Sequence, residues 1–247
     1  MSKFTKLLKS KVVKEGIKQA QKHALPVIKK ELEKKKRQCE KIMEQSRYAH
    51  YVSTVLFQKR NRRMKVLNHH RDLELYGMGR SAAVFKLKNE NRVIKIFYSP
   101  FEETAKEEKQ NYEKLNGDDY YPVIYEAGKN YLVMDFIEGK TFFECLAEGI
   151  PLDPYYMEEV DRGLQYAEKA GLNPSDIHLH NLILTKKGNV HIIDVARFSQ
   201  EKKCTQWNDL KWAYTRYYQH AYFPKKIPRW VMYTVSKLYR LYRYIYN

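Results

Sequence analysis

Three polar side chains bracket a short predicted hairpin in the second half of the chain, and this feature constrains the fold most. Asp176 and Asn181 lie in the segment Asp-Ile-His-Leu-His-Asn, and Asp194 directly follows the apolar run Val-His-Ile-Ile further along. Between them, residues 182–185 and 190–193 are mostly apolar and are joined by a Gly-containing turn, which is typical of two paired strands. Such a hairpin would hold two carboxylates and one amide at fixed separations.

These residue types suit a site that binds metal ions and phosphate. Carboxylate and amide oxygens are hard ligands that Mg²⁺ accepts, and catalysis of phosphoryl transfer consists mostly of positioning and charge neutralisation. In such a site Asn181 and Asp194 would hold the metal ions, and Asp176 would lie near the acceptor hydroxyl. The alternative is an ordinary hairpin in which Asp and Asn serve as caps and turn residues.

A glycine-rich segment lies about a hundred residues upstream. Gly77 and Gly79 lie in Leu-Tyr-Gly-Met-Gly-Arg-Ser, and Val84 follows in the next apolar stretch. The pattern predicts a strand, a turn and a second strand, in which the absence of side chains lets backbone N–H groups approach phosphates. Two glycines at this spacing are weak evidence when they stand alone.

A lysine and a glutamate form a candidate ion pair. Lys95 lies inside the β-rich run Arg-Val-Ile-Lys-Ile-Phe, where a buried ammonium needs a partner. Glu108 lies on the same predicted helix face as Tyr112 and Leu115, which follow it by four and seven residues. We therefore expect Glu108 to pair with Lys95. The alternatives are an exposed Lys95 or a pair with Glu107.

Residues 130–139, Asn-Tyr-Leu-Val-Met-Asp-Phe-Ile-Glu-Gly, predict a strand that runs into a glycine turn. With it, the ordered motifs over roughly residues 70–215 resemble the protein-kinase-like superfamily, especially its small atypical bacterial-type Ser/Thr kinases of the RIO-type and lipopolysaccharide-kinase-like branches. The resemblance implies an α+β, two-lobed fold with a truncated C-lobe and an added basic helical N-terminal extension. It also implies that Met134 lies beside the adenine and that residues 135–138 form the hinge.

The resemblance further implies an ATP- and Mg²⁺-dependent kinase that transfers the γ-phosphoryl group to a hydroxyl. Asp176 would be the base, Lys95 would contact the α/β-phosphates, and Glu108 would orient Lys95. The implied Mg²⁺ ligands are Asn181 and Asp194. The implied nucleotide contacts are Gly77, Gly79, Val84, Lys95, Met134, Asp135 and Ile137.

Several positions depart from the family pattern. Pro174 and Ser175 stand where the family has His and Arg, and Asp194 is followed by Val-Ala where Phe-Gly is common. Only fifteen positions separate Asp194 from Asp209, which resembles the helix Asp that ties down the catalytic-loop backbone. The interval is too short for a long activation segment.

These departures leave the acceptor open. We expect protein serine or threonine to be the substrate. The missing activation segment and the His178-containing loop favour a small-molecule kinase of the sugar, lipopolysaccharide or choline type instead. The lost family residues favour a nucleotide-binding pseudokinase scaffold, although every charged group that the chemistry needs is present.

The formal net charge of +17 is concentrated at the N-terminus. Residues 1–70 contain 20 Lys and Arg and five Glu, net +15, whereas the rest contains 26 basic and 24 acidic residues, net +2. We expect a basic helical extension over residues 1–63, helical from Ser2 to about Phe57 or Gln58 and broken at Pro26. The kinase-like domain is expected over residues 64–247, with its N-lobe at about 70–137 and its C-lobe at about 138–247.

Both ends of the chain suggest possible partners. The basic extension could pack on the small lobe, lie on an anionic membrane surface or bind nucleic acid. Residues 227–246 carry aromatic side chains at helical spacing among arginines. That pattern favours packing on the chain's own domain, with a cation–aromatic surface for lipid headgroups or nucleic acid as the alternative.

The sequence has no apolar run long enough to span a bilayer and no cleavable leader pattern. We therefore expect a cytoplasmic protein, with peripheral contact at the inner membrane face as an alternative. Cys39, Cys145 and Cys204 lack the paired spacing of a metal site and are expected to be reduced thiols. The expected partner is a protein substrate or a small-molecule hydroxyl acceptor, and the oligomeric state cannot be inferred.

Overall fold

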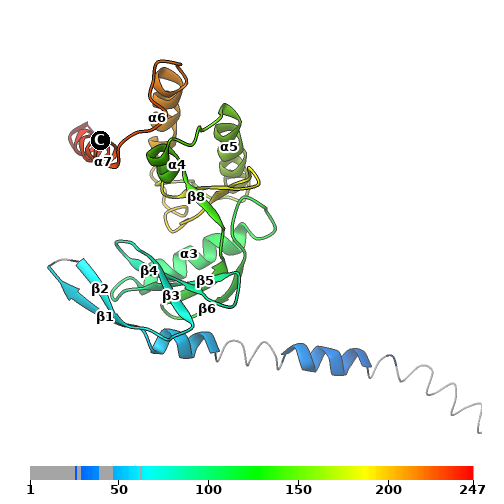
Figure 1. Cartoon of the computed structure of the whole chain (residues 1–247). Helices are drawn as coiled ribbons and strands as arrows, with labels where there is room; N and C mark the ends of the chain where they lie inside the picture. The colour runs from blue at the N-terminus through cyan, green and yellow to red at the C-terminus, as the bar shows by residue number, and fades with distance from the viewer. Residues whose placement is uncertain (1–25, 27–28, 39–46, 62, 247) are drawn as a thin grey trace, which may run out of the picture. The chain divides into compact units, whose positions relative to one another are not determined.

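The computed structural model of the chain describes residue 26 and residues 29–38, 47–61 and 63–246. The chain divides into two compact units, Met1–Ser53 and Thr54–Asn247. Figure 1 shows the helices and strands of the chain. In the first unit, residues 29–38 and 47–53 are helical. The helix predicted for residues 2–25 lies outside the described residues.

The helix predicted to continue to Gln58 ends earlier, at residue 53. Strand β1 (Leu56–Arg60) pairs instead with β2 (Arg63–Asn68) in an antiparallel hairpin. Residues 55–57 are Val-Leu-Phe, and β-branched and aromatic side chains favour strands. Cross-strand pairing overrides the helical pattern here, and the prediction was wrong for residues 56–58.

A five-stranded antiparallel sheet with the order β3-β4-β5-β7-β6 forms the first half of the second unit. Its central strand is buried on both faces, since Val93, Ile94, Ile96 and Phe97 are each at most 6% exposed. Helix α3 contacts three of these strands. The elements are β3 (Leu73–Met78), β4 (Ala82–Leu87), β5 (Arg92–Phe97), α3 (Glu102–Lys114), β6 (Ile124–Ala127) and β7 (Tyr131–Asp135).

The second half contains a three-stranded sheet of β8, β9 and β10 together with helices. Helix α4 begins with a capping box, in which the Thr141 hydroxyl accepts from the Glu144 N–H and the Glu144 carboxylate accepts from the Thr141 N–H. None of the described helices is both long and apolar enough to cross a membrane. The elements are β8 (Gly139–Thr141), α4 (Phe142–Glu148), α5 (Pro154–Lys169), β9 (Leu182–Thr185), β10 (Val190–Ile192), α6 (Gln206–Ala213), η1 (Tyr214–Tyr218) and α7 (Arg229–Tyr246).

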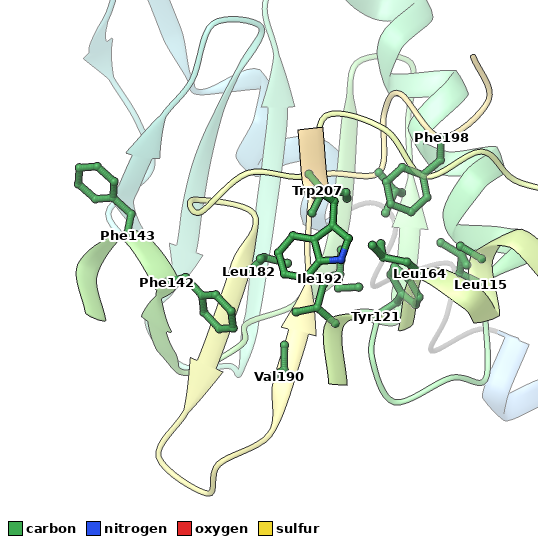
Figure 2. Packing of buried hydrophobic residues seen from close by; sticks show 14 of the residues in the cluster. Leu115, Tyr121, Phe142, Phe143, Leu164, Leu182, Val190, Ile192, Phe198 and Trp207 are labelled. Atoms are coloured by element: carbon green, nitrogen blue, oxygen red, sulfur yellow. The ribbon is translucent and has the colours of Figure 1, made fainter. Parts of the chain in front are cut away.

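The β9–β10 hairpin is packed into the hydrophobic core. Figure 2 shows Trp207 of α6, Ile192 of β10 and Leu182 of β9, which belong to one cluster of buried residues. The Trp207 indole N–H donates to the Asp161 carboxylate of α5 at 2.7 Å and so ties α6 to α5. Leu182 and Ile192 are fully buried. Because its strands are fixed in this way, the hairpin holds the residues at its ends in defined positions.

Candidate active site

Lys95 lies between two carboxylates. Its Nζ is 2.7 Å from both Glu108 oxygens and 3.0 Å from Asp194 Oδ1. The Glu108 side chain is fully buried and the Lys95 side chain is 12% exposed. The predicted pair of Lys95 and Glu108 is confirmed, and Glu107, the alternative partner, is exposed.

The charges of this cluster shift one another's pKa values. Burial lowers the pKa of the Lys95 ammonium, but the charges of Glu108 and Asp194 outweigh burial, so that this pKa is raised. Burial raises the pKa of the Glu108 carboxyl to about 7, against the effect of Lys95. The Lys95 charge holds the pKa of the Asp194 carboxyl below its usual value, against the effect of burial. The Lys95 side chain is therefore an ammonium at neutral pH.

One face of α3 holds the segment that carries Asp194. Glu108, Asn111 and Tyr112 are three and four residues apart, so they project from the same side of the helix. The Asn111 amide donates to the Val195 carbonyl at 2.9 Å, and the Asp194 N–H donates to the Tyr112 hydroxyl at 3.1 Å. Asn111 was not predicted, although its spacing from Glu108 could have indicated it.

The glycine-rich strands and Lys95 form a row across the sheet. Gly77 is opposite Val84, and Val84 is opposite Lys95. Directly opposed residues of antiparallel strands share a face. Met134 on β7 is two residues from the position opposite Lys95, so it faces the same side, and it is 6% exposed. Gly79 lies in the β3–β4 turn, where its N–H donates to the Ala82 carbonyl at 2.8 Å.

Within the described residues, two backbone N–H groups of the predicted hinge, those of Ile137 and Glu138, have no protein acceptor. The Asp135 N–H donates to the Val123 carbonyl at 3.1 Å, and the Phe136 N–H donates to the Asn91 carbonyl at 3.0 Å. The Ile137 and Glu138 N–H groups are therefore available to a ligand.

The loop from Asp176 to Asn181 is closed on itself and joined to the strand that precedes Asp194. The Asn181 amide nitrogen donates to the Asp176 carbonyl at 3.2 Å. The Asn181 carbonyl accepts from the Ile193 N–H at 2.8 Å. Asp176 and Asp194 both adopt the left-handed backbone region, with φ of 62° and 63°. This conformation is strained for residues other than glycine and is frequent at functional sites.

The donors at this place fit Mg²⁺. Asn181 offers an amide oxygen and Asp194 a carboxylate, and the Asp194 side chain is 48% exposed. In the part of the chain that the structure describes, no group of three or more His, Cys, Asp or Glu side chains could hold a metal ion. Mg²⁺ at nucleotide sites nevertheless needs only one or two protein carboxylates, because phosphates and water supply the other ligands.

Arg197 and Asp209 differ from expectation. Arg197 Nε lies 3.4 Å from Asp176 Oδ2, and Arg197 was not among the predicted residues. Asp209, expected to bind the catalytic-loop backbone, accepts instead from the Thr205 hydroxyl at 3.1 Å and the Tyr239 hydroxyl at 2.6 Å. The expectation for Asp209 was wrong: within the described residues its carboxylate accepts from no backbone group of the catalytic loop, and the Thr205 and Tyr239 hydroxyls both donate to Oδ2.

The two loop histidines have different surroundings. The His180 ring stacks on Phe143, with ring centroids 4.1 Å apart. His178 Nδ1 is buried and makes no hydrogen bond within the described residues. His180 therefore packs the loop onto α4. The His178 Nδ1 atom, in contrast, is available inside the loop for a hydrogen bond to a ligand.

No protein-family model matches this chain. YrzF of Bacillus subtilis (strain 168), whose name assigns it provisionally to the serine/threonine-protein kinases, is 47% identical over 189 residues, covering 76% of this chain and 88% of YrzF. The chain belongs to the protein-kinase-like superfamily. It is thus a kinase-like phosphotransferase, and membership implies ATP, a divalent metal ion and an acceptor group.

Two further comparisons cover less of this phosphotransferase. The serine/threonine-protein kinase PknL of Mycobacterium tuberculosis (strain CDC 1551 / Oshkosh) is 35% identical over 79 residues, which span 29% of this chain and 20% of PknL. A crystal structure of WbdD superposes with a TM-score of 0.47 at 20% identity and covers 60% of this chain and 38% of that chain.

Proposed function

We propose that this chain transfers the γ-phosphoryl group of ATP to serine or threonine hydroxyls of a protein, with Mg²⁺ as the metal ion. The position of Lys95 carries the proposal, because its ammonium lies 2.7 Å from the buried Glu108 and 3.0 Å from Asp194. A lysine held in this way can bind the α/β-phosphates beside the metal. The kinase names of YrzF and PknL support a protein acceptor.

The proposed architecture has two lobes. The five-stranded sheet and α3 make the N-lobe, and the small sheet with α4 to α7 makes a truncated C-lobe. Residues 1–63 form the basic extension in this proposal and residues 64–247 the kinase-like domain. The adenine would accept from the Ile137 N–H and donate to the hinge carbonyl of Asp135, with Met134 beside it. Gly77, Gly79 and Val84 would cover the phosphates.

The acceptor hydroxyl would meet Asp176. This side chain is 38% exposed, so an acceptor can reach it, and its carboxylate would take the hydroxyl proton as the new P–O bond forms. Asn181 and Asp194 would hold Mg²⁺, which when bound neutralises charge on the β- and γ-phosphates.

A small-molecule hydroxyl acceptor is the second candidate. Only residues 193–205 separate β10 from α6, and in a protein kinase this interval carries the segment that binds the substrate peptide. Asp176 and the unpaired Nδ1 of His178 would then face a smaller, polar acceptor. Phosphorylation of such an acceptor needs no peptide-binding strand.

The test is to incubate the purified full chain with γ-labelled ATP and Mg²⁺, first with a general protein acceptor and then with a fractionated small-molecule extract. Asp176→Asn removes the proposed base while keeping the size of the side chain. Asp119→Asn, the same change at an exposed aspartate, is the matched control.

Label in phosphoserine or phosphothreonine, lost in Asp176→Asn and kept in Asp119→Asn, is the expected result. Label only in a small molecule, with the same dependence on Asp176, would replace the first candidate by the second. Binding of ATP without transfer to either pool would contradict both and leave a nucleotide-binding scaffold.

A further inference from the structure

The C-terminal helix α7 uses one side to attach to its own unit. Met232 is 9% exposed, the Tyr239 hydroxyl donates to Asp209 at 2.6 Å, and the Arg243 guanidinium donates to Cys204 Sγ at 3.8 Å. These three residues are seven and four positions apart, which places them on the same side of a helix. Figure 1 shows α7, in red, at the edge of the helical part of this unit.

The apolar side of α7 is directed away from these contacts. Trp230, Leu238, Leu241 and Ile245 are 71%, 62%, 56% and 61% exposed. They are eight, three and four positions apart and therefore form one stripe, which we call the α7 stripe. A helix of a compact domain normally buries its apolar stripe against the core. Here the core contacts use the opposite side.

The sequence that follows Asp209 is strongly basic. After Asp209 the sequence contains eight Lys and Arg and no Asp or Glu, whereas residues 71–209 contain 18 basic and 24 acidic residues, net −6. Arg229, Lys237 and Arg240 of α7 are all exposed. Positive charge is thus concentrated on the element that also exposes the apolar residues.

Exposed aromatic rings also lie on α7 and on the segments that precede it. Trp212 is 61% exposed, Tyr222 is 79% exposed and Tyr244 is 88% exposed. Trp and Tyr gather at membrane interfaces, where the ring lies in the apolar region and its polar atom reaches the headgroups. The C-terminal part of the chain therefore combines an apolar stripe, exposed aromatic rings and an excess of positive charge.

We propose that α7 is an interfacial helix that binds the surface of an anionic lipid bilayer, with the α7 stripe in the acyl–headgroup boundary and its basic residues on lipid phosphates. An amphipathic helix that is rich in Lys and Arg and carries Trp and Leu on its other side has the features of such helices. Anionic headgroups attract exposed basic residues next to the surface.

The charge distribution favours a bilayer over other occupants. A second copy that packed its α7 stripe against the first would bring the basic residues of both copies around one interface, where like charges repel. A nucleic acid would use the basic and aromatic residues but would leave Leu238, Leu241 and Ile245 exposed to water. Of these three occupants, a lipid surface is the one that engages both groups.

Co-sedimentation of the full chain with vesicles tests the proposal. The test compares binding to phosphatidylglycerol-containing vesicles with binding to phosphatidylcholine vesicles, for the unmodified chain and for the Leu238→Glu/Leu241→Glu variant. Leu67→Glu, at a leucine that is 60% exposed on β2, is the matched control. Both variants change exposed side chains, and an unchanged unfolding temperature verifies that they fold.

The unmodified chain and Leu67→Glu should bind anionic vesicles, and the double variant should bind at least tenfold more weakly. Equal binding by the double variant would overturn the proposal, since the basic N-terminus alone would then account for the affinity. A concentration-dependent dimer that the double variant loses, without vesicle binding, would overturn it in favour of a second copy. Tight binding to a nucleic acid but not to vesicles would likewise overturn it.

Tryptophan fluorescence supplies a second readout at the helix itself. Trp207 is 7% exposed, so in the Trp212→Phe variant Trp230 is the exposed reporter. Anionic vesicles should shift its emission to shorter wavelength, and lipids brominated in their acyl chains should quench it. Vesicle binding without a shift or quenching would show that α7 stays in water and would overturn the proposal.

Discussion

Arg197 Nε lies 3.4 Å from Asp176 Oδ2, so the proposed base forms an ion pair with a residue from the segment that follows β10. The two side chains are 50% and 38% exposed. A half-exposed pair contributes little to stability. Its consequence lies in orientation, because Arg197 fixes where the Asp176 carboxylate points. The arginine that the family places directly before this acid is Ser175 here.

Replacement of Arg197 by Met should lower kcat by about 10- to 100-fold, because a small misplacement of a catalytic group has an effect of that order. KM for ATP should change less than kcat, since Arg197 pairs with Asp176 on the acceptor side and acts on Asp194 through its charge alone. Arg197→Lys should recover part of the rate. Steady-state kinetics beside Arg71→Met, a change at a side chain that is 90% exposed, checks this. An unchanged kcat in Arg197→Met would remove Arg197 from the site.

Variants of the Lys95–Glu108 pair should affect the stability of the domain and its transfer activity differently. Lys95→Met leaves the fully buried Glu108 carboxylate without its ammonium, and breaking a buried pair in this way costs about 3–5 kcal/mol. Lys95→Met/Glu108→Leu removes both charges and should recover most of that loss. Neither variant should transfer phosphate, because the contact to the phosphates is missing in both.

Urea unfolding and the labelled-ATP assay measure the two effects. The exposed pair Lys109 and Glu113 provides the control, because Lys109→Met/Glu113→Leu should change stability by less than about 1 kcal/mol and should leave transfer intact. A double variant at Lys95 and Glu108 no more stable than Lys95→Met would contradict the assignment of a buried, mutually dependent pair.

Gly139 has no room for a side chain. A Cβ there would meet the Leu184 carbonyl oxygen at 2.5 Å and Ile183 Cγ2 at 2.7 Å, whereas a Cβ at Gly77 would meet nothing within 4 Å. Gly139→Ala should therefore destabilise the domain by about 1–3 kcal/mol, as overpacking typically does. Gly77→Ala should leave the unfolding temperature unchanged. Thermal unfolding distinguishes them, and equal temperatures would contradict the close approach of β8 and β9.

Cys204 should react with iodoacetamide faster than Cys145 in mildly alkaline buffer. Burial raises the pKa of the Cys145 thiol to about 11. Burial also acts to raise the pKa of Cys204, but hydrogen bonds from backbone groups and Arg243 outweigh it and lower that pKa. A lower pKa means more thiolate at a given pH, and the thiolate is the nucleophile.

Mass spectrometry of the Cys39→Ser chain follows the two sites separately. Arg243→Gln should slow the alkylation of Cys204, whereas Arg240→Gln, at an exposed arginine, should not. Faster modification of Cys145 would contradict the packing of α7 against Cys204.

The Lys95–Glu108 contact was predictable because two local patterns specify it. A lysine inside an apolar strand needs a counter-charge, and the helix period places Glu108 on the buried side with Tyr112. The β9–β10 hairpin was also predictable from a local pattern. Two apolar runs that are joined by a Gly-containing turn have few other ways to pair.

The contacts that depend on distant packing were not predictable. Arg197 reaches Asp176 only because the chain turns after β10, and no local sequence pattern predicts that turn. Asp209 is bound by Tyr239, which is thirty residues away. The hairpin at residues 56–68 begins inside the segment predicted as helix, which extended to Gln58, and strand pairing decides the conformation of residues 56–58.

The most direct test of the phosphoryl-transfer site is the Mg²⁺ dependence of ATP binding and transfer in Asp194→Asn. Calorimetric titration with ATP, with and without Mg²⁺, should show that Mg²⁺ tightens binding to the unmodified chain but not to Asp194→Asn. The rate of transfer by Asp194→Asn should fall by about 100-fold or more, because the loss of one main electrostatic contact to the transferred group typically lowers the rate by that much. Mg²⁺-dependent binding and transfer that are the same in both proteins would contradict the account.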